Sequence, residues 1–205
     1  MKHIKSTEYI DDNVCRVVLD DYTVLELDSF SVSQSGIEAG EDAEDAVIAE
    51  LIFTSECIKA QKIALKYLNL KMRTEKQLEK YLKGKGFSPE AIQNTLENMK
   101  QWGYIDDAAY ARAYIDYRLS CSKKSWRAIF YDLKAEGINE DTIEEVTGEY
   151  DADEYLRACD VAARVLNGKS DEASLRRLNG LLARNGFGWD VINQVVNEAS
   201  RGEDF

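Results

Sequence analysis

Three stretches of this chain repeat one pattern of side chains in strict register. Each stretch opens with Thr or Ser, carries apolar residues four and eight positions later, and reaches Gly after another four. An apolar residue, a small or polar residue and, four positions beyond, Ile complete the pattern. The copies are Thr74–Ile92, Ser125–Ile143 and Ser174–Ile192. This spacing, interrupted by one Gly, predicts two short helices joined by a tight turn in every copy.

The positions around each Gly match what helix ends require. Gly adopts the left-handed backbone that ends a helix, and the apolar residue after it packs back onto the Leu one turn earlier. The opening Thr or Ser can cap the first helix, where Gln77 completes a capping box with Thr74, and the residue before the second helix can cap that one. The predicted turns are Gly86-Phe87-Ser88, Gly137-Ile138-Asn139 and Gly186-Phe187-Gly188. Pro89 then occupies a first helical position, where proline is favoured.

A further helix is predicted ahead of each copy. Ser55 could cap one before the first copy, Asp106 one before the second, and Asp151 or Asp153 one before the third. Three helices in roughly 50 residues are typical of repeat proteins whose units stack on their neighbours. We predict a mainly α fold in which three tandem three-helix repeats form an elongated, curved rod. The predicted parts are an amino-terminal segment (1–54) and repeats at 55–105, 106–150 and 151–205.

The amino-terminal segment differs from the repeats in pattern. Val14–Leu19 and Tyr22–Leu27 are rich in β-branched and apolar residues and are separated by two Asp residues. They predict a β-hairpin, to which Phe30–Val32 could add a third strand. The apolar residues of 43–52 then predict a helix, which would end before the helix capped by Ser55.

Composition argues against catalysis. At 205 residues the chain is long enough to fold without disulfides or metals, and its four cysteines form no CxxC pair. No basic apolar leader or long hydrophobic span occurs, which predicts a cytoplasmic protein that does not span a membrane. The single histidine, His3, lies in a terminus expected to be mobile, and no Gly-rich phosphate loop appears. We therefore predict no enzymatic activity and no cofactor or metal.

Charge is distributed unevenly along the chain, whose net charge is −12. Residues 1–58 carry three Lys and Arg against 14 Asp and Glu, a net −11, whereas residues 59–106 carry ten against five, a net +5. The remaining segments, 107–150 and 151–205, are each −3. Basic residues at helical spacing in the first two repeats are the candidate binding residues. They are Arg73, Lys76, Lys80, Lys83, Lys85, Arg112, Arg118, Lys123, Lys124 and Arg127. Such groups also occur as ordinary solvated helix faces.

Several spaced motifs in the first two repeats occur in a characteristic order. They are Ala64-Leu65-x-Tyr67-Leu68, Met72-Arg73-Thr74-Glu75-x-x-Leu78-x-x-Tyr81-Leu82, Lys85-Gly86-Phe87 and Gly103-Tyr104-Ile105-Asp106-Asp107-x-x-Tyr110-Ala111. This series resembles the signature of the RecX family, bacterial regulators of the RecA recombinase, most clearly over residues 60–145. The third repeat diverges most, as terminal repeats commonly do.

The resemblance implies a regulator in DNA repair and the SOS response. Such a protein would bind RecA filaments on single-stranded DNA, restrain strand exchange and ATP hydrolysis, and act as a monomer. Family members are often basic and this chain is acidic, which leaves its direct binding to single-stranded DNA open. The acidic amino-terminal segment would face away from the filament or meet a basic patch of the partner.

Two other functions are compatible with the pattern. Three-helix units with a Gly turn also describe helix-turn-helix DNA-binding proteins, although Glu90, Gln93 and Glu97 would give the first copy a poor surface for a duplex. A general protein-interaction scaffold is the second alternative. Aromatic residues at helical spacing are expected to pack within or between repeats rather than to stack on bases. They are Tyr110, Tyr114, Tyr117, Trp102, Trp126 and Trp189.

Overall fold

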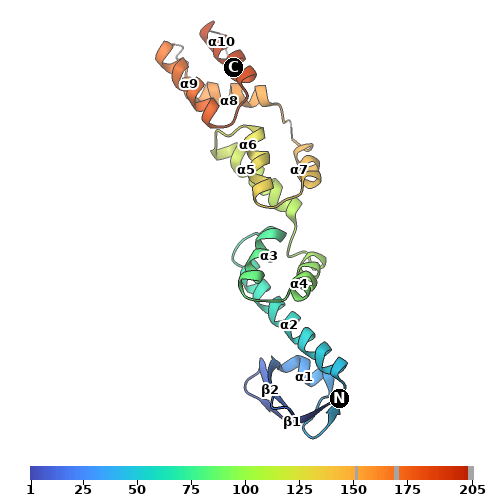
Figure 1. Cartoon of the computed structure of the whole chain (residues 1–205). Coiled ribbons are helices and arrows are strands. Elements are labelled where there is room, and N and C mark those ends of the chain that lie inside the picture. Colours follow the sequence, from blue (N-terminus) through green and yellow to red (C-terminus); the bar gives the residue numbers. More distant parts are fainter. Residues whose placement is uncertain (151, 169–170, 203–205) are drawn as a thin grey trace. The chain divides into compact units, whose positions relative to one another are not determined.

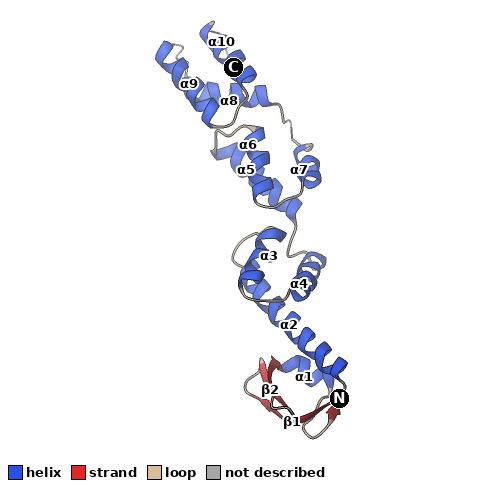
Figure 2. Ribbon diagram, viewed as in Figure 1, coloured by secondary structure: helices blue, strands red, loops and turns tan. Residues whose placement is uncertain are grey.

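A computed structural model describes residues 1–150, 152–168 and 171–202 (Figure 1). In this part of the chain ten helices follow a small sheet, and the strands are confined to the amino-terminal region (Figure 2). The chain divides into two compact units. The first comprises Met1–Arg73 and Gln77–Ile105, and the second comprises Thr74–Lys76 and Asp106–Phe205.

The amino-terminal module is an antiparallel sheet with one short helix. Its elements are β1 (Lys2–Tyr9), β2 (Val14–Leu19), β3 (Val24–Asp28), α1 (Ser29–Ser35) and β4 (Asp42–Ala43), and the strand order is β3-β2-β1-β4. The predicted hairpin of β2 and β3 is confirmed, with Val17 opposite Leu25. Its turn is made without Gly, because Tyr22 takes the left-handed conformation (φ 64°).

Two sequence-based expectations for this module are wrong. Phe30–Val32 lies in α1 rather than in a strand, because Asp28 caps that helix and its carboxylate accepts hydrogen bonds from the Phe30 and Ser31 amides. The segment around His3 is strand β1 rather than a mobile terminus, and His3 Nδ1 lies 2.8 Å from Asp42 Oδ1. Most residues of β1 are polar, so the apolar alternation that reveals a half-buried strand is missing from the sequence.

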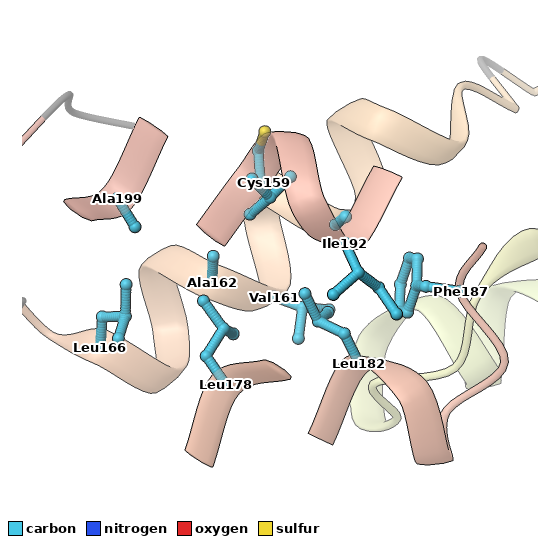
Figure 3. Close-up of a cluster of buried hydrophobic side chains, with 11 residues drawn as sticks. Cys159, Val161, Ala162, Leu166, Leu178, Leu182, Phe187, Ile192 and Ala199 are labelled. Atoms are coloured by element: carbon cyan, nitrogen blue, oxygen red, sulfur yellow. The ribbon is translucent and has the colours of Figure 1, made fainter. Parts of the chain in front are cut away.

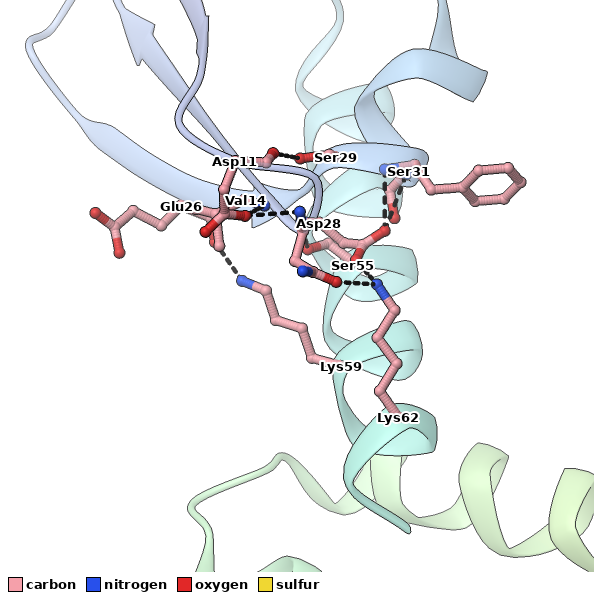
Figure 4. Close-up of polar contacts among 11 residues, drawn as sticks. Asp11, Val14, Glu26, Asp28, Ser29, Ser31, Ser55, Lys59 and Lys62 are labelled. Atoms are coloured by element: carbon pink, nitrogen blue, oxygen red, sulfur yellow. Dashed lines mark hydrogen bonds and ion pairs between the residues drawn. The ribbon is translucent and has the colours of Figure 1, made fainter. Parts of the chain in front are cut away.

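Helix α2 (Asp45–Leu68) is continuous where two helices were expected. Ser55 lies in its interior and is 1% exposed, and its Oγ accepts a hydrogen bond from the Asp28 amide at 2.6 Å (Figure 4). The serine therefore joins α2 to the sheet module and does not cap a helix. The boundary predicted between residues 54 and 55 falls inside α2. The predicted division into an amino-terminal segment and a first repeat stays a prediction.

The rest of the chain forms the three predicted three-helix modules. Their helices are α2, α3 (Glu75–Gly84) and α4 (Pro89–Gln101); α5 (Asp107–Cys121), α6 (Trp126–Ala135) and α7 (Glu140–Thr147); and α8 (Glu154–Leu166), α9 (Glu172–Arg184) and α10 (Trp189–Ser200). Each module buries its own apolar cluster, and Leu82, Leu133 and Leu182 are fully buried in the three equivalent positions. Figure 3 shows the cluster of the third module, in which Leu182 lies beside Phe187 and Ile192.

The three turn glycines take the predicted left-handed backbone. Gly86, Gly137 and Gly186 have φ values of 86°, 97° and 92°, in the left-handed region. The Schellman hydrogen bond is present from the Ile138 amide to the Leu133 carbonyl oxygen, at 3.2 Å. Asp106 and Asp153 cap α5 and α8 as expected, whereas the expectation at Asp151 lies outside the described residues. The expected cap at Ser174 is wrong, because Asp171 caps α9 one turn earlier and accepts from the Ser174 amide.

The aromatic residues divide between buried and exposed positions. Tyr110 and Tyr114 are half-buried and pack against the core of the second module, as predicted. Trp102 and Trp189 are 52% and 66% exposed and Tyr117 is 61% exposed, so the prediction of packing is wrong for these three. The two Trp residues lie at helix ends, where the apolar periodicity of the helix no longer dictates which way a side chain faces. No described helix is both long and apolar enough to cross a membrane.

Candidate partner-binding site

The first unit presents two stacked tyrosines flanked by cations. The ring of Tyr67, near the end of α2, lies parallel to that of Tyr81 on α3, with centroids 3.9 Å apart and planes 7° apart. The Arg73 guanidinium carbon lies 4.2 Å from the Tyr67 centroid, and Lys85 Nζ lies 5.3 Å from the Tyr81 centroid. The stacked rings leave no room between them, so each cation lies on an outer face. We call Tyr67, Tyr81, Arg73 and Lys85 the tyrosine column.

A groove of 570 Å³ runs along this column. Its lining also includes Lys80, and no Asp or Glu is among the lining residues. Arg73 is half-buried, and its Nε atom has no hydrogen-bond partner among the described residues. Cation–π contact holds the Arg73 guanidinium in place over the Tyr67 ring. Three cations around a groove whose described lining contains no carboxylate have the charge that an anion, such as a phosphate or an acidic side chain, would require.

The other two candidate residues of α3 lie outside this groove. The stem of Lys76 lies against the turn at Gly137, where an added Cβ would overlap Lys76 Cδ. Lys83 is exposed and forms no ion pair within the described part of the chain. The five basic residues of the first repeat therefore do not act as one uniform strip, and the structure brings together Arg73, Lys80 and Lys85.

In the second unit Arg112 is engaged by an internal partner. Its Nε and Nη2 atoms donate to both carboxylate oxygens of Glu149 at 2.6 to 3.1 Å. The hydrogen bonds raise the pKa of Arg112 and lower the pKa of Glu149. This bidentate pair joins α5 to the end of α7, so we assign Arg112 a structural role.

Arg118 and Lys124 are likewise directed at an internal carboxylate. Asp132 Oδ2 lies 2.5 Å from Lys124 Nζ, 2.7 Å from the Tyr114 hydroxyl and 3.8 Å from Arg118 Nη2. Burial raises the pKa of Asp132, but the hydrogen bonds from Lys124 and Tyr114 together outweigh it and the net pKa is lowered. These two cations therefore stabilise the second module and are not free to meet a partner's charge.

Lys123 and Arg127 complete the predicted set. Neither forms an ion pair within the described residues, and Arg127 lines a separate groove of 480 Å³ with Trp126 and Phe130. Sequence reasoning missed Tyr67 and Tyr81, whose stacking organises the strongest cationic site. Both tyrosines belong to the motif series quoted above, and this was the signal available for finding them.

The fold defines a class of protein in which a small amino-terminal sheet module is followed along the chain by tandem three-helix modules. Residues 60–99 match the family pattern described as "RecX, first three-helix domain", and residues 106–146 match "RecX, second three-helix domain". The two patterns cover α3, α5 and α6 in full and most of α4 and α7, together with the final part of α2.

Named relatives and solved structures agree with this match. "Regulatory protein RecX" of Bacillus subtilis (strain 168) is 27% identical over 192 residues, covering 92% of this chain and 73% of that protein. The Clostridium botulinum (strain Alaska E43 / Type E3) protein of the same name is 27% identical, covering 91% and 90%. A crystal structure of regulatory protein RecX shares the fold, with a TM-score of 0.68, 21% identity and coverage of 97% and 100%. RecX from Lactobacillus salivarius does so with a TM-score of 0.61, 22% identity and coverage of 72% and 99%.

Residues 60–99 and 106–146 are thus similar to the first and second three-helix domains of RecX, and proteins named regulatory protein RecX align with most of the chain.

Proposed function

We propose that this protein binds RecA filaments on single-stranded DNA and restrains strand exchange and ATP hydrolysis, without chemistry of its own. Similarity to proteins named regulatory protein RecX supports this role. The observation that carries it is the cationic groove of the tyrosine column, which lies on a chain whose net charge is −12. A locally basic site allows such a chain to approach the anionic surface of a nucleoprotein filament despite its overall charge.

The site within that proposal is Arg73, Lys80 and Lys85. Within the described part of the chain these cations form no ion pair with a carboxylate, whereas Arg112, Arg118 and Lys124 are held by Glu149 and Asp132. Charge reversal in the second group would disrupt the module, so loss of function there would not identify a binding site. Within the first group Lys80 and Lys85 can be changed with little loss of packing, because both are exposed, whereas Arg73 is half-buried against Tyr67.

The test is a double charge reversal, Lys80→Glu with Lys85→Glu. Arg176→Glu provides the control, because Arg176 is a highly exposed cation on α9 whose surface ion pair with Glu172 contributes little stability. Binding to RecA filaments assembled on single-stranded DNA with a non-hydrolysable nucleotide, and inhibition of RecA ATPase, are measured for the wild type and both variants. We expect binding of the double variant to weaken by about tenfold or more, with the control unchanged.

The outcomes separate the function from the site. A wild-type protein that neither binds filaments nor slows ATP hydrolysis would refute the function. A wild type that does both, with a folded double variant that is equally active, would refute only the site. Binding to duplex DNA alone, with a steep salt dependence, would instead favour a helix-turn-helix DNA-binding protein.

A further inference from the structure

The amino-terminal module contains a second groove, between α1 and α2, with a volume of 330 Å³. Its walls include Phe30 and Ser31 from α1 and Val47, Glu50, Leu51 and Ile58 from α2. Phe30 and Val47 are 62% and 41% exposed, although large apolar side chains usually avoid water. Two helices thus present apolar residues along one depression, which is the geometry that receives a partner helix in helix-in-groove recognition.

A buried hydroxyl in this groove lacks a hydrogen-bond partner. Ser31 is 3% exposed, and its Oγ atom forms no hydrogen bond within the described part of the chain. The Ser31 amide donates a hydrogen bond to Asp28 Oδ1 at 3.3 Å, so the unbonded group is the side-chain hydroxyl (Figure 4). An unsatisfied buried hydroxyl is costly to a fold and is rare in native proteins. A ligand that offers a polar atom to the floor of the groove would remove this cost.

The charge around the groove restricts its occupant. Glu50 is the only charged residue among the lining residues, and residues 1–58 carry a net −11. The next two lysines along α2 are directed at the sheet module, where Lys59 Nζ donates to the Glu26 carbonyl oxygen and Lys62 Nζ to Asp28 Oδ2 (Figure 4). Phosphate groups are repelled by such a surface and basic side chains are attracted to it.

We propose that the groove between α1 and α2 binds a basic amphipathic helix of a protein partner. The apolar face of that helix would pack on Phe30, Val47 and Leu51, and a polar atom beside its apolar anchor would bond to the Ser31 hydroxyl. Its Lys and Arg residues would face Glu50 and the surrounding acidic surface. This site is distinct from the cationic groove of the tyrosine column and does not depend on the function proposed above.

The test measures binding of a fluorescent synthetic helix to the full chain. The probe carries leucines on one face and lysines on the other, and a matched probe carries glutamates in place of the lysines. The variants are Phe30→Ser, in the groove, and Phe53→Ser, which removes an equally large side chain that is 40% exposed on α2 outside the groove. A third variant, Ser31→Ala, removes the unpartnered hydroxyl without removing apolar contact.

We expect the lysine probe to bind the wild type and Phe53→Ser alike, and to bind Phe30→Ser about tenfold more weakly. Ser31→Ala should bind more weakly while melting at the same or a higher temperature, which a purely structural serine would not do. The glutamate probe should not bind. Failure of the lysine probe to bind the wild type, equal binding by the two Phe variants, or equal binding of both probes would each overturn the proposal. A single-stranded oligonucleotide that competes for this groove would also overturn it.

Discussion

The backbone amide of Ser125 donates a hydrogen bond to the carbonyl oxygen of Asn185, at 3.0 Å. Ser125 precedes α6, and Asn185 is the residue before the turn glycine of the third copy, Gly186. The contact is close, because an added Cβ at Gly186 would lie 3.0 Å from both Ala128 Cβ and Ser125 Oγ. The start of a helix in one copy therefore packs on the glycine turn of the next.

The same contact occurs one copy earlier within the second unit. Thr74 Oγ1 donates to the carbonyl oxygen of Glu136 at 2.8 Å, and Glu136 precedes Gly137. In both places the first amide of the following helix also bonds a carboxylate: Glu75 bonds Asp107 at 2.9 Å and Trp126 bonds Glu154 at 2.8 Å. Gly137 and Gly186 thus have two roles. Each adopts a left-handed backbone, and each leaves space for side chains of the preceding copy, Lys76 at Gly137 and Ala128 at Gly186. Two glycines at equivalent positions of the pattern should therefore differ in how much stability is lost when a side chain is added.

Gly137→Ala should destabilise the protein more than Gly86→Ala. Both residues have a left-handed backbone, which costs a residue with a Cβ about 1–2 kcal/mol. A Cβ at Gly86 meets nothing within 4 Å, whereas one at Gly137 would also overlap the stem of Lys76. Urea unfolding of both variants measures the difference. Gly84→Ala, at an ordinary helical position with open space, should be neutral or slightly stabilising, and equal losses at all three sites would contradict the assignment.

Arg157→Met should strongly destabilise the second unit. Arg157 is 7% exposed, and its guanidinium donates to backbone carbonyl oxygens at and beyond the end of α5, including Ser122 at 2.7 Å. Loss of this group removes a charged donor from several part-buried carbonyl oxygens, at about 1–3 kcal/mol for each that is left unsatisfied. Arg164→Met is the matched control, because Arg164 lies on the same helix in an exposed pair with Asp160. Chemical denaturation should show a large loss for the first variant and less than about 1 kcal/mol for the second.

Stability should decrease with rising pH in the alkaline range through Tyr114. Burial and the hydrogen bond to Asp132 raise the pKa of Tyr114 from 10.0 to about 12. The folded state therefore holds this proton more tightly than the unfolded chain, so its contribution is complete below pH 10 and is lost as pH rises toward 12. Urea unfolding at several alkaline pH values should show a shallower decrease for Tyr114→Phe than for the wild type. Parallel pH profiles would rule out this role for Tyr114.

Asp28→Ala should weaken the packing of α1 and the sheet on α2 without affecting the rest of the protein. The buried carboxylate caps α1 and accepts from Lys62 Nζ at 2.6 Å, so its loss removes a helix cap and a bond to α2 (Figure 4). Loss of the cap alone costs about 0.5–2 kcal/mol. Hydrogen exchange should accelerate in α1 and the sheet while the protection of α9 and α10 is unchanged. Asp21→Ala, which breaks an exposed pair with Lys2, should leave exchange in α1 as it is.

Local sequence signals predicted the repeated modules well, because each turn is specified by chemistry within a few residues. Gly137, Ile138 and Asn139 take the predicted conformation, contact and cap. Where a distant partner decides the structure, prediction was wrong. Ser55 could be a cap by sequence, but the Asp28 amide 27 residues away makes it an acceptor inside α2. The elongated, curved rod stays a prediction.

The candidate site was predicted only in part for the same reason. Helical spacing marked Arg73 and Lys80 as basic residues on one side of a predicted helix; Arg73 lies just before α3 in the structure, and the groove contains both. Spacing could not show that Tyr67, on another helix, stacks on Tyr81 and positions the guanidinium of Arg73. Nor could it show that Arg118 and Lys124 meet at Asp132, because such pairs depend on how α5 and α6 pack.

The continuity of α2 sets a fixed distance within the first unit. The helix has 24 residues, about 36 Å of rigid backbone. Val47, in the groove beside α1, lies near its beginning, and Tyr67, in the tyrosine column, lies near its end. A molecule that engages both places at once must present its acidic and its basic features at the separation that this helix imposes. A partner whose acidic and basic groups are spaced differently from the two grooves would therefore be unable to occupy both at once.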